Sequence, residues 1–143
     1  MQDVMIHFQS RMIYKEDQSV EEQKATFQGQ AAIKNGSLFL RYQEVMEELG
    51  EVSHTIKIMG DQATILRQGP ITMRQPLEQG ARTEGTYRSP YGRMATTTKT
   101  NVLRSSWNPE IPSGSIYIEY ELAMQGQEVG LCQLTYNLTG GLS

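Results

Sequence analysis

Apolar and polar residues alternate with a period of two along most of this chain. The alternation is clearest in four segments, which span residues 4–14, 52–58, 116–124 and 132–138. In residues 52–58 (VSHTIKI), Val52, His54, Ile56 and Ile58 share one face. A strand places successive side chains on opposite faces, so this pattern predicts antiparallel strands with one buried and one solvated face. No long segment shows the three- and four-residue spacing of an amphipathic helix.

Turn signals separate the alternating segments at short intervals. They lie at residues 34–37, 48–51, 59–62, 77–80, 112–115 and 125–128, and Asn35-Gly36 suits a tight hairpin because both residues tolerate positive φ. The spacing predicts about eight to ten strands joined by hairpins. The predicted fold class is therefore all-β, an up-and-down antiparallel barrel whose closure removes exposed sheet edges. We expect a single β-barrel domain over residues 1–143, with these side chains inside: Ile6, Phe8, Ile56, Ile58, Ile118, Tyr120, Leu134 and Tyr136.

The composition favours an ordinary globular protein of a reducing compartment. Of the 143 residues, 38% are hydrophobic and 20% are charged, which is neither a disordered nor a membrane composition. No apolar run reaches the roughly 18–20 residues that a spanning helix needs, and the N-terminus lacks the pattern of a secretory signal. Cys132 is the one cysteine, so no internal disulfide can form. We expect a cytoplasmic protein that does not bind membranes.

Charge is distributed unevenly along the chain. Residues 1–66 carry 6 basic and 10 acidic residues, residues 67–104 carry 7 and 2, and residues 105–143 carry none and 4. A basic middle could attract an anionic ligand or nucleic acid. We favour the alternative, in which basic and acidic strands pair across the sheet. No nucleic-acid binding is expected at physiological salt.

The residues that could carry metal binding or catalysis are few and scattered. His7, His54 and Cys132 are too few for a structural zinc site, which needs four nitrogen or sulfur ligands. His54 lies on an apolar face, which is typical of a hydrogen-bonded core histidine. Cys132 alternates with apolar residues as a small buried hydrophobe does. No catalytic or phosphate-binding motif is present, so we predict no enzyme, no metal and no cofactor.

The basic segment, residues 67–104, contains the candidate binding residues. Gly69, Pro70 and Pro76 interrupt its strands. In GTYRSPYGRM (residues 85–94), Pro90 and Tyr91 suit the centre of a β-turn, followed by Gly92. The next strand is rich in threonine, so either of its faces would bring hydroxyl groups inside. Such an interior could be a partly polar ligand cavity or a filled interior with its own hydrogen bonds.

These features together resemble a known family, the YwiB-like bacterial proteins of unknown function. The matching features are a central Arg-x-Gly, a Tyr-x-Ser-Pro-Tyr-Gly loop, a Thr-rich strand and a late Gly-x-Ile-x-Ile-x-Tyr-x-Leu strand. Here they are carried by Arg67 and Gly69, Tyr87 to Gly92, Thr100, and residues 114–122. The resemblance covers nearly the whole chain and implies a calycin-like, lipocalin-like β-barrel. It implies no activity.

The favoured function is non-enzymatic binding of a small amphipathic or anionic molecule inside the barrel. The polar contacts would be Arg67, Arg74, Tyr87, Tyr91, Arg93, Thr98 and Thr100. The tyrosines and arginines around Pro90 would then gather near one barrel opening. The alternative function is a protein-interaction or scaffold barrel with a filled interior and no ligand. The sequence leaves the oligomeric state open, and a homodimer is compatible with it.

Overall fold

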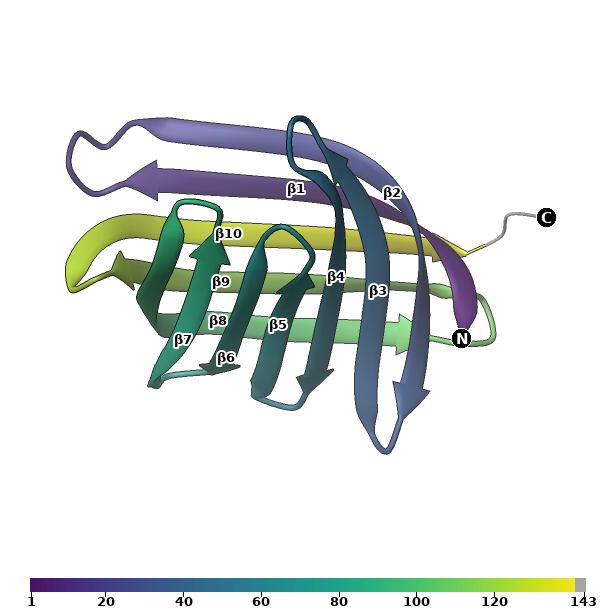
Figure 1. Ribbon diagram of the computed structural model, residues 1–143. Helices are drawn as coiled ribbons and strands as arrows, with labels where there is room; N and C mark the ends of the chain where they lie inside the picture. The colour runs from purple at the N-terminus through teal and green to yellow at the C-terminus, as the bar shows by residue number, and fades with distance from the viewer. Residues whose placement is uncertain (141–143) are drawn as a thin grey trace.

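The structure, a computed structural model, describes residues 1–140 and contains ten strands. They are β1 (Gln2–Tyr14), β2 (Val20–Lys34), β3 (Ser37–Met46), β4 (Gly50–Met59), β5 (Gln62–Gln68), β6 (Thr72–Glu78), β7 (Arg82–Ser89), β8 (Gly92–Asn108), β9 (Ser113–Met124) and β10 (Gln127–Gly140). Each strand pairs antiparallel with the next, and β1 also pairs with β10, which closes the barrel (Figure 1). The predicted up-and-down barrel is therefore confirmed. Within residues 1–140 no helix is long and apolar enough to cross a membrane.

Two ladders in the wall are short. β2 has 15 residues, but only Gly29–Lys34 pair with β3, whereas residues 20–28 pair with β1 alone. β6 and β7 pair only over Thr72–Arg74 and Thr86–Arg88. Strands β3 to β7 also cross β8, β9 and β10 at a steep angle (Figure 1). The wall is thus a continuous meander with two places where neighbouring strands separate.

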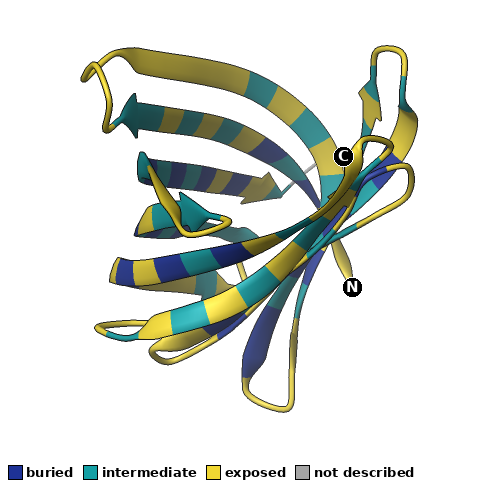
Figure 2. Cartoon of the chain, turned by 60° about the vertical axis from the view of Figure 1, so that its left-hand side comes forward, coloured by how far each residue is buried: buried dark blue, intermediate teal, exposed yellow. Residues whose placement is uncertain are grey.

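The core fills one half of the barrel. Alternation along the strands, visible as alternating buried and exposed residues in Figure 2, directs one face of each strand inward. The buried cluster is almost wholly aliphatic where it is deepest, and its fully buried members include Ile6, Leu40, Ile56, Ile58, Leu77, Ile116, Ile118 and Leu138. All eight predicted interior residues belong to this cluster or, in the case of Phe8, pack against it. That prediction is confirmed.

A buried glutamine fills the gap between β6 and β7. The Gln75 side chain accepts a hydrogen bond from Thr96 Oγ1 at 2.6 Å and donates one to Thr98 Oγ1 at 3.2 Å. Gly85 on β7 makes room for it, because a Cβ there would lie 2.5 Å from Gln75 Oε1. The inward face of the Thr-rich strand is therefore Thr96, Thr98 and Thr100, and the hydroxyls of Thr96 and Thr98 are bonded within the wall. This part of the interior is filled.

The GTYRSPYGRM segment is a hairpin, as its turn residues predict. Pro90 and Tyr91 form the two-residue turn between β7 and β8, and Ser89 pairs with Gly92. Gly92 has a φ of 132°, which side-chain-bearing residues rarely adopt. At the other end of the barrel, Asn35 and Gly36 have φ values of 51° and 81°, as their hairpin requires.

We predict that Gly92→Val lowers the free energy of unfolding by about 1–3 kcal/mol, because the valine must adopt a strained backbone conformation. Nothing lies within 4 Å of the position its Cβ would take, so the loss comes from the backbone and not from a clash. Tyr91→Phe is the matched control and should change stability by less than about 0.5 kcal/mol. Urea unfolding measures both. An equal loss in the two variants would show that the Tyr91 hydroxyl is structural.

Candidate functional site

The half of the barrel opposite the aliphatic core opens at a mouth. The register of the ladders places five hairpin turns at this end, which join β1 to β2, β3 to β4, β5 to β6, β7 to β8, and β9 to β10. Below the turns lies a cavity of about 330 Å³, lined by residues of all ten strands. This volume is at the lower end of the range for small-molecule sites. We call it the lumen.

One row of directly opposed residues sets the chemistry of the lumen wall. Tyr42, His54, Arg67, Met73 and Tyr87 stand opposite one another in sequence across β3, β4, β5, β6 and β7. The next row toward the core is Leu40, Ile56, Ile65 and Gln75. The interior therefore changes from aliphatic to aromatic and cationic within one pleat of the sheet.

Arg67 is the one cation of the five-residue row, and its charge has no partner. Its Nε is buried without a hydrogen-bond partner among the described residues, and Arg67 forms no ion pair within residues 1–140. Burial raises the pKa of Tyr42, Tyr120, Cys132 and Tyr136, and the positive charge of Arg67 opposes this shift in all four. The guanidinium thus lies among groups from β3, β9 and β10. The side chain as a whole is half-buried, and withdrawing part of a charged group from water without a partner is unfavourable.

Three tyrosines surround this charge. Burial raises the pKa of Tyr42 to about 12, and it raises the pKa of Tyr120 and Tyr136 well above the ordinary value of 10.0. Their phenols are therefore protonated at neutral pH and can donate hydrogen bonds. A guanidinium together with phenol donors is a suitable environment for an anion.

His54 joins the lumen wall to a carboxylate. Its Nε2 lies 3.0 Å from Oε1 of Glu44, and its ring stacks on Tyr42 with centroids 4.6 Å apart and planes at 3°. Phe27 stacks on the other side of Tyr42 at 4.6 Å. Burial, and then the charge of Arg67, lower the pKa of His54, while Glu44 opposes that shift. The prediction of a hydrogen-bonded core histidine is confirmed.

The structure brings only some of the predicted contacts to the lumen. Arg67 and Tyr87 line it. Thr98 and Thr100 point inward but are fully buried below it, and Thr98 is already hydrogen-bonded.

Arg74, Tyr91 and Arg93 are exposed on the outside of the barrel wall and do not line the lumen, although the turn that carries Tyr91 lies at the mouth. Arg74 follows Met73, and Arg93 precedes Met94, which stands opposite Tyr87. Successive side chains of a strand point to opposite faces, so Arg74 and Arg93 point outward where Met73 and Met94 point inward. Tyr91 is 98% exposed because it forms the tip of its turn.

The sequence reasoning did not identify Tyr42 and Glu44 as candidates, and it assigned Tyr120 and Tyr136 only to the core. The available signal was the hairpin register. Met59 stands opposite Gln62, and the same ladder brings His54 opposite Arg67. The expected pairing of basic with acidic strands holds only in part. Lys99 on β8 stands opposite Glu121 on β9, but Arg88 stands opposite Arg93 and Arg82 opposite Lys99 in the β7–β8 ladder.

A second hollow lies on the outer face of the barrel. It has a volume of about 490 Å³ and is lined by residues that include Lys15, Lys99, Glu121 and Glu128. Lys15 and Glu128 form an ion pair at 2.9 Å across it. Within residues 1–140 no group of three or more His, Cys, Asp and Glu side chains could hold a metal ion. Because its charges are mixed and partly paired, the outer hollow is a weaker candidate than the lumen.

The lowered pKa of His54 predicts a dependence of stability on pH. As the pH falls below the ordinary histidine value of 6.5, the unfolded chain binds a proton before the folded chain does, so the folded state loses stability. We expect the free energy of unfolding to fall between pH 7.5 and 5.5 and to fall less steeply in His54→Gln. His7→Gln, which changes an exposed histidine, is the control and should follow the unchanged protein. Equal slopes in all three proteins would contradict the assignment.

Two comparisons with known proteins give matches. Residues 6–135 match the family described as Domain of unknown function (DUF1934). The crystal structure of the ywiB protein from Bacillus subtilis superposes with a TM-score of 0.84 at 23% identity, over 98% of this chain and 92% of that one. No curated protein matches the chain. The resemblance to YwiB-like proteins is thereby confirmed, and the chain belongs to the DUF1934 family of unknown function.

Proposed function

We propose that this barrel binds a small amphipathic molecule through an anionic group, with Arg67 as the anchor. The observation that carries the proposal is the buried Nε of Arg67, which has no partner among the described residues. Within residues 1–140 this cation forms no ion pair, and the two carboxylates that also line the lumen are Glu21 and Glu44, of which Glu44 bonds to His54. A bound carboxylate, sulfonate or phosphate would supply the missing charge and hydrogen bonds.

The surrounding residues define the two ends of such a ligand. The anionic group would lie against Arg67 and accept hydrogen bonds from the phenols of Tyr42 and Tyr120, which line the lumen with it. The apolar body would extend along the aromatic and thioether side chains of the wall, which include Phe8, Phe27, Met73 and Tyr87. Ligand sites commonly combine an apolar wall with a few placed polar groups.

The alternative of a filled scaffold barrel accounts for the Gln75 region but not for Arg67. A filled interior is expected to satisfy its polar groups. The Gln75 cluster does so, since three hydroxyls and the amide bond one another or the backbone. Two buried polar atoms have no partner among the described residues, Arg67 Nε at the lumen and Thr100 Oγ1 in the filled interior. Of the two, Arg67 belongs to a charged group that lines a cavity, which favours a ligand there. Cys132, which is free and buried, is compatible with the proposed cytoplasmic location.

A matched pair of fluorescent probes tests the anchor. The anionic probe is 8-anilinonaphthalene-1-sulfonate, and the neutral probe is N-phenyl-1-naphthylamine, which has the same rings without the sulfonate. Arg67→Met should weaken binding of the anionic probe at least about tenfold, since a hydrogen bond to a charged group contributes about 1.5–3 kcal/mol. Binding of the neutral probe should be unchanged.

Arg74→Met is the control for charge, because Arg74 lies on the neighbouring strand but outside the wall. It should leave the affinity for both probes unchanged. Far-UV circular dichroism confirms that each variant is folded. An equal affinity of Arg67→Met and the unchanged protein for the sulfonate would contradict the role of Arg67.

A further inference from the structure

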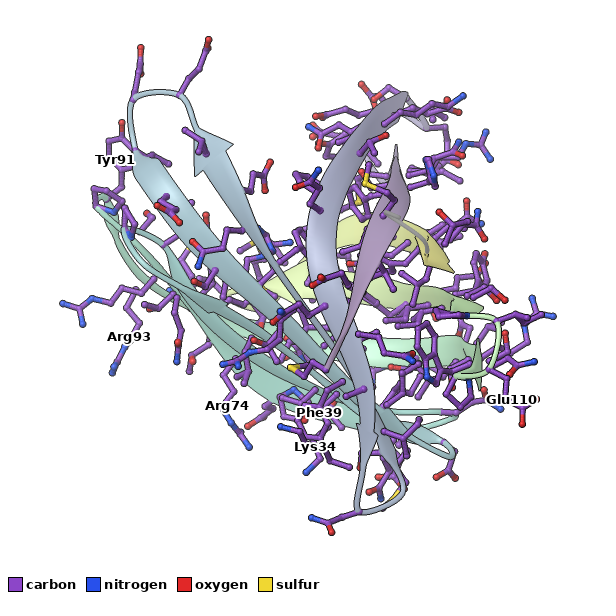
Figure 3. All side chains as sticks on the ribbon, turned by 90° about the vertical axis from the view of Figure 1, so that its right-hand side faces the viewer. Lys34, Phe39, Arg74, Tyr91, Arg93 and Glu110 are labelled. Atoms are coloured by element: carbon purple, nitrogen blue, oxygen red, sulfur yellow. The ribbon has the colours of Figure 1, made fainter. Side chains whose placement is uncertain are left out.

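The hairpin between β7 and β8 carries an uncompensated positive charge on the outside of the barrel. Arg88 and Arg93 stand directly opposite each other in its ladder, and like charges in that position are destabilising. Arg74 lies on the same outer face, two residues from Thr72, the partner of Arg88. In Figure 3, Arg74 and Arg93 point away from the barrel on the same side. None of the three forms an ion pair within residues 1–140.

The tip of this hairpin adds an exposed aromatic ring to the charge. Tyr91 is 98% exposed, and its backbone N–H donates to Ser89 Oγ at 3.1 Å, which helps to fix the turn. Arginine and tyrosine are the residue types most enriched among the energetic centres of protein interfaces. We call residues 88–93 the basic hairpin.

A second hairpin on the same rim has the opposite character. The turn between β3 and β4 carries Glu47 and Glu48, and Glu51 lies at the start of β4. Val45, near the end of β3, is 81% exposed. None of these glutamates forms an ion pair within the described part of the chain. On the β1–β2 hairpin, by contrast, Glu22 already pairs with Arg11 at 3.1 Å. We call residues 45–51 the acidic hairpin.

The positions of the two hairpins allow two copies of the chain to pair each other's unpaired charges. Both lie at the mouth, and only the turn between β5 and β6 separates them along the rim. We propose that the protein forms a two-fold symmetric dimer, mouth to mouth, in which each basic hairpin contacts the acidic hairpin of the partner. Two-fold symmetry makes this contact twice. The inference does not depend on whether the lumen holds a ligand.

Charge complementarity favours a second copy over a nucleic acid. The chain has a net charge of −3, and Glu84 lies on the same outer face of β7 as Arg88. A nucleic acid gains affinity from many phosphate contacts along a basic track, whereas Glu84 lies between the Arg88–Arg93 pair and the Arg82–Lys99 pair on this face. A second copy supplies an acidic patch of matching size that is itself without a partner.

Charge exchange between the hairpins tests the proposal. The basic-to-acidic variant is Arg88→Glu with Arg93→Glu, and the acidic-to-basic variant is Glu47→Lys with Glu51→Lys. Sedimentation velocity should show the unchanged protein as a dimer whose dissociation constant rises at least about tenfold from low to high salt. Each variant alone should be monomeric, because its two contacts would join like charges. An equimolar mixture of the two should form a dimer again, since both contacts then join opposite charges.

Lys34→Glu with Arg41→Glu is the control, because these exposed residues lie away from the mouth. It should dimerise as the unchanged protein does. The proposal is overturned if the unchanged protein stays monomeric at about 200 µM, a concentration far above the micromolar dissociation constants of weak complexes. It is also overturned if neither variant alters the dimer, or if the mixture stays monomeric. Monomeric protein that binds a single-stranded RNA through Arg88 and Arg93 would likewise overturn it.

Discussion

The register of the hairpin ladders is the constraint on which the rest of the structure depends. Every neighbouring pair of strands is antiparallel, and most are joined by a short turn, so the position of each turn fixes which residues stand opposite each other. A slip of one residue at the turn between β4 and β5 would move His54 and Arg67 out of the same row. The aliphatic floor, the cationic row and the outward arginines all follow from this register together with the alternation of side chains.

The aliphatic half of the interior stabilises the fold, whereas the lumen half contains groups whose burial is unfavourable. The deep half contains Ile56, Ile58, Ile116 and Ile118, each at most 1% exposed. Burial of such side chains stabilises a fold by about 1.5–3 kcal/mol each. The lumen half holds a guanidinium whose buried Nε has no partner within residues 1–140 and a histidine whose pKa is lowered by burial. Groups that weaken the fold where a cavity opens are typical of binding sites.

Much of the fold could be predicted from the sequence, because alternation and turn residues act locally. Asn35-Gly36 identified a hairpin, and the two-residue turn at Pro90-Tyr91 is the one the sequence indicates. The site was harder, because its members come together through register over several turns. Whether Arg67, Arg74 and Arg93 point into or out of the barrel depends on the residues that interrupt β5, β6 and β7. The sequence does not define how those segments bend. Tyr42 and Glu44 reach Arg67 only through the β3–β4 and β4–β5 ladders.

The central claim is that Arg67 is held in the lumen for a bound anion and is not part of a satisfied structural network. The most direct test is the free energy of unfolding of the ligand-free protein with Arg67 replaced by methionine, which keeps the length and apolar stem of the side chain. Our account predicts that Arg67→Met is at least as stable as the unchanged protein, because it removes a half-buried guanidinium whose Nε has no partner among the described residues. A loss of about 3–5 kcal/mol, the effect of breaking a buried ion pair, would contradict it.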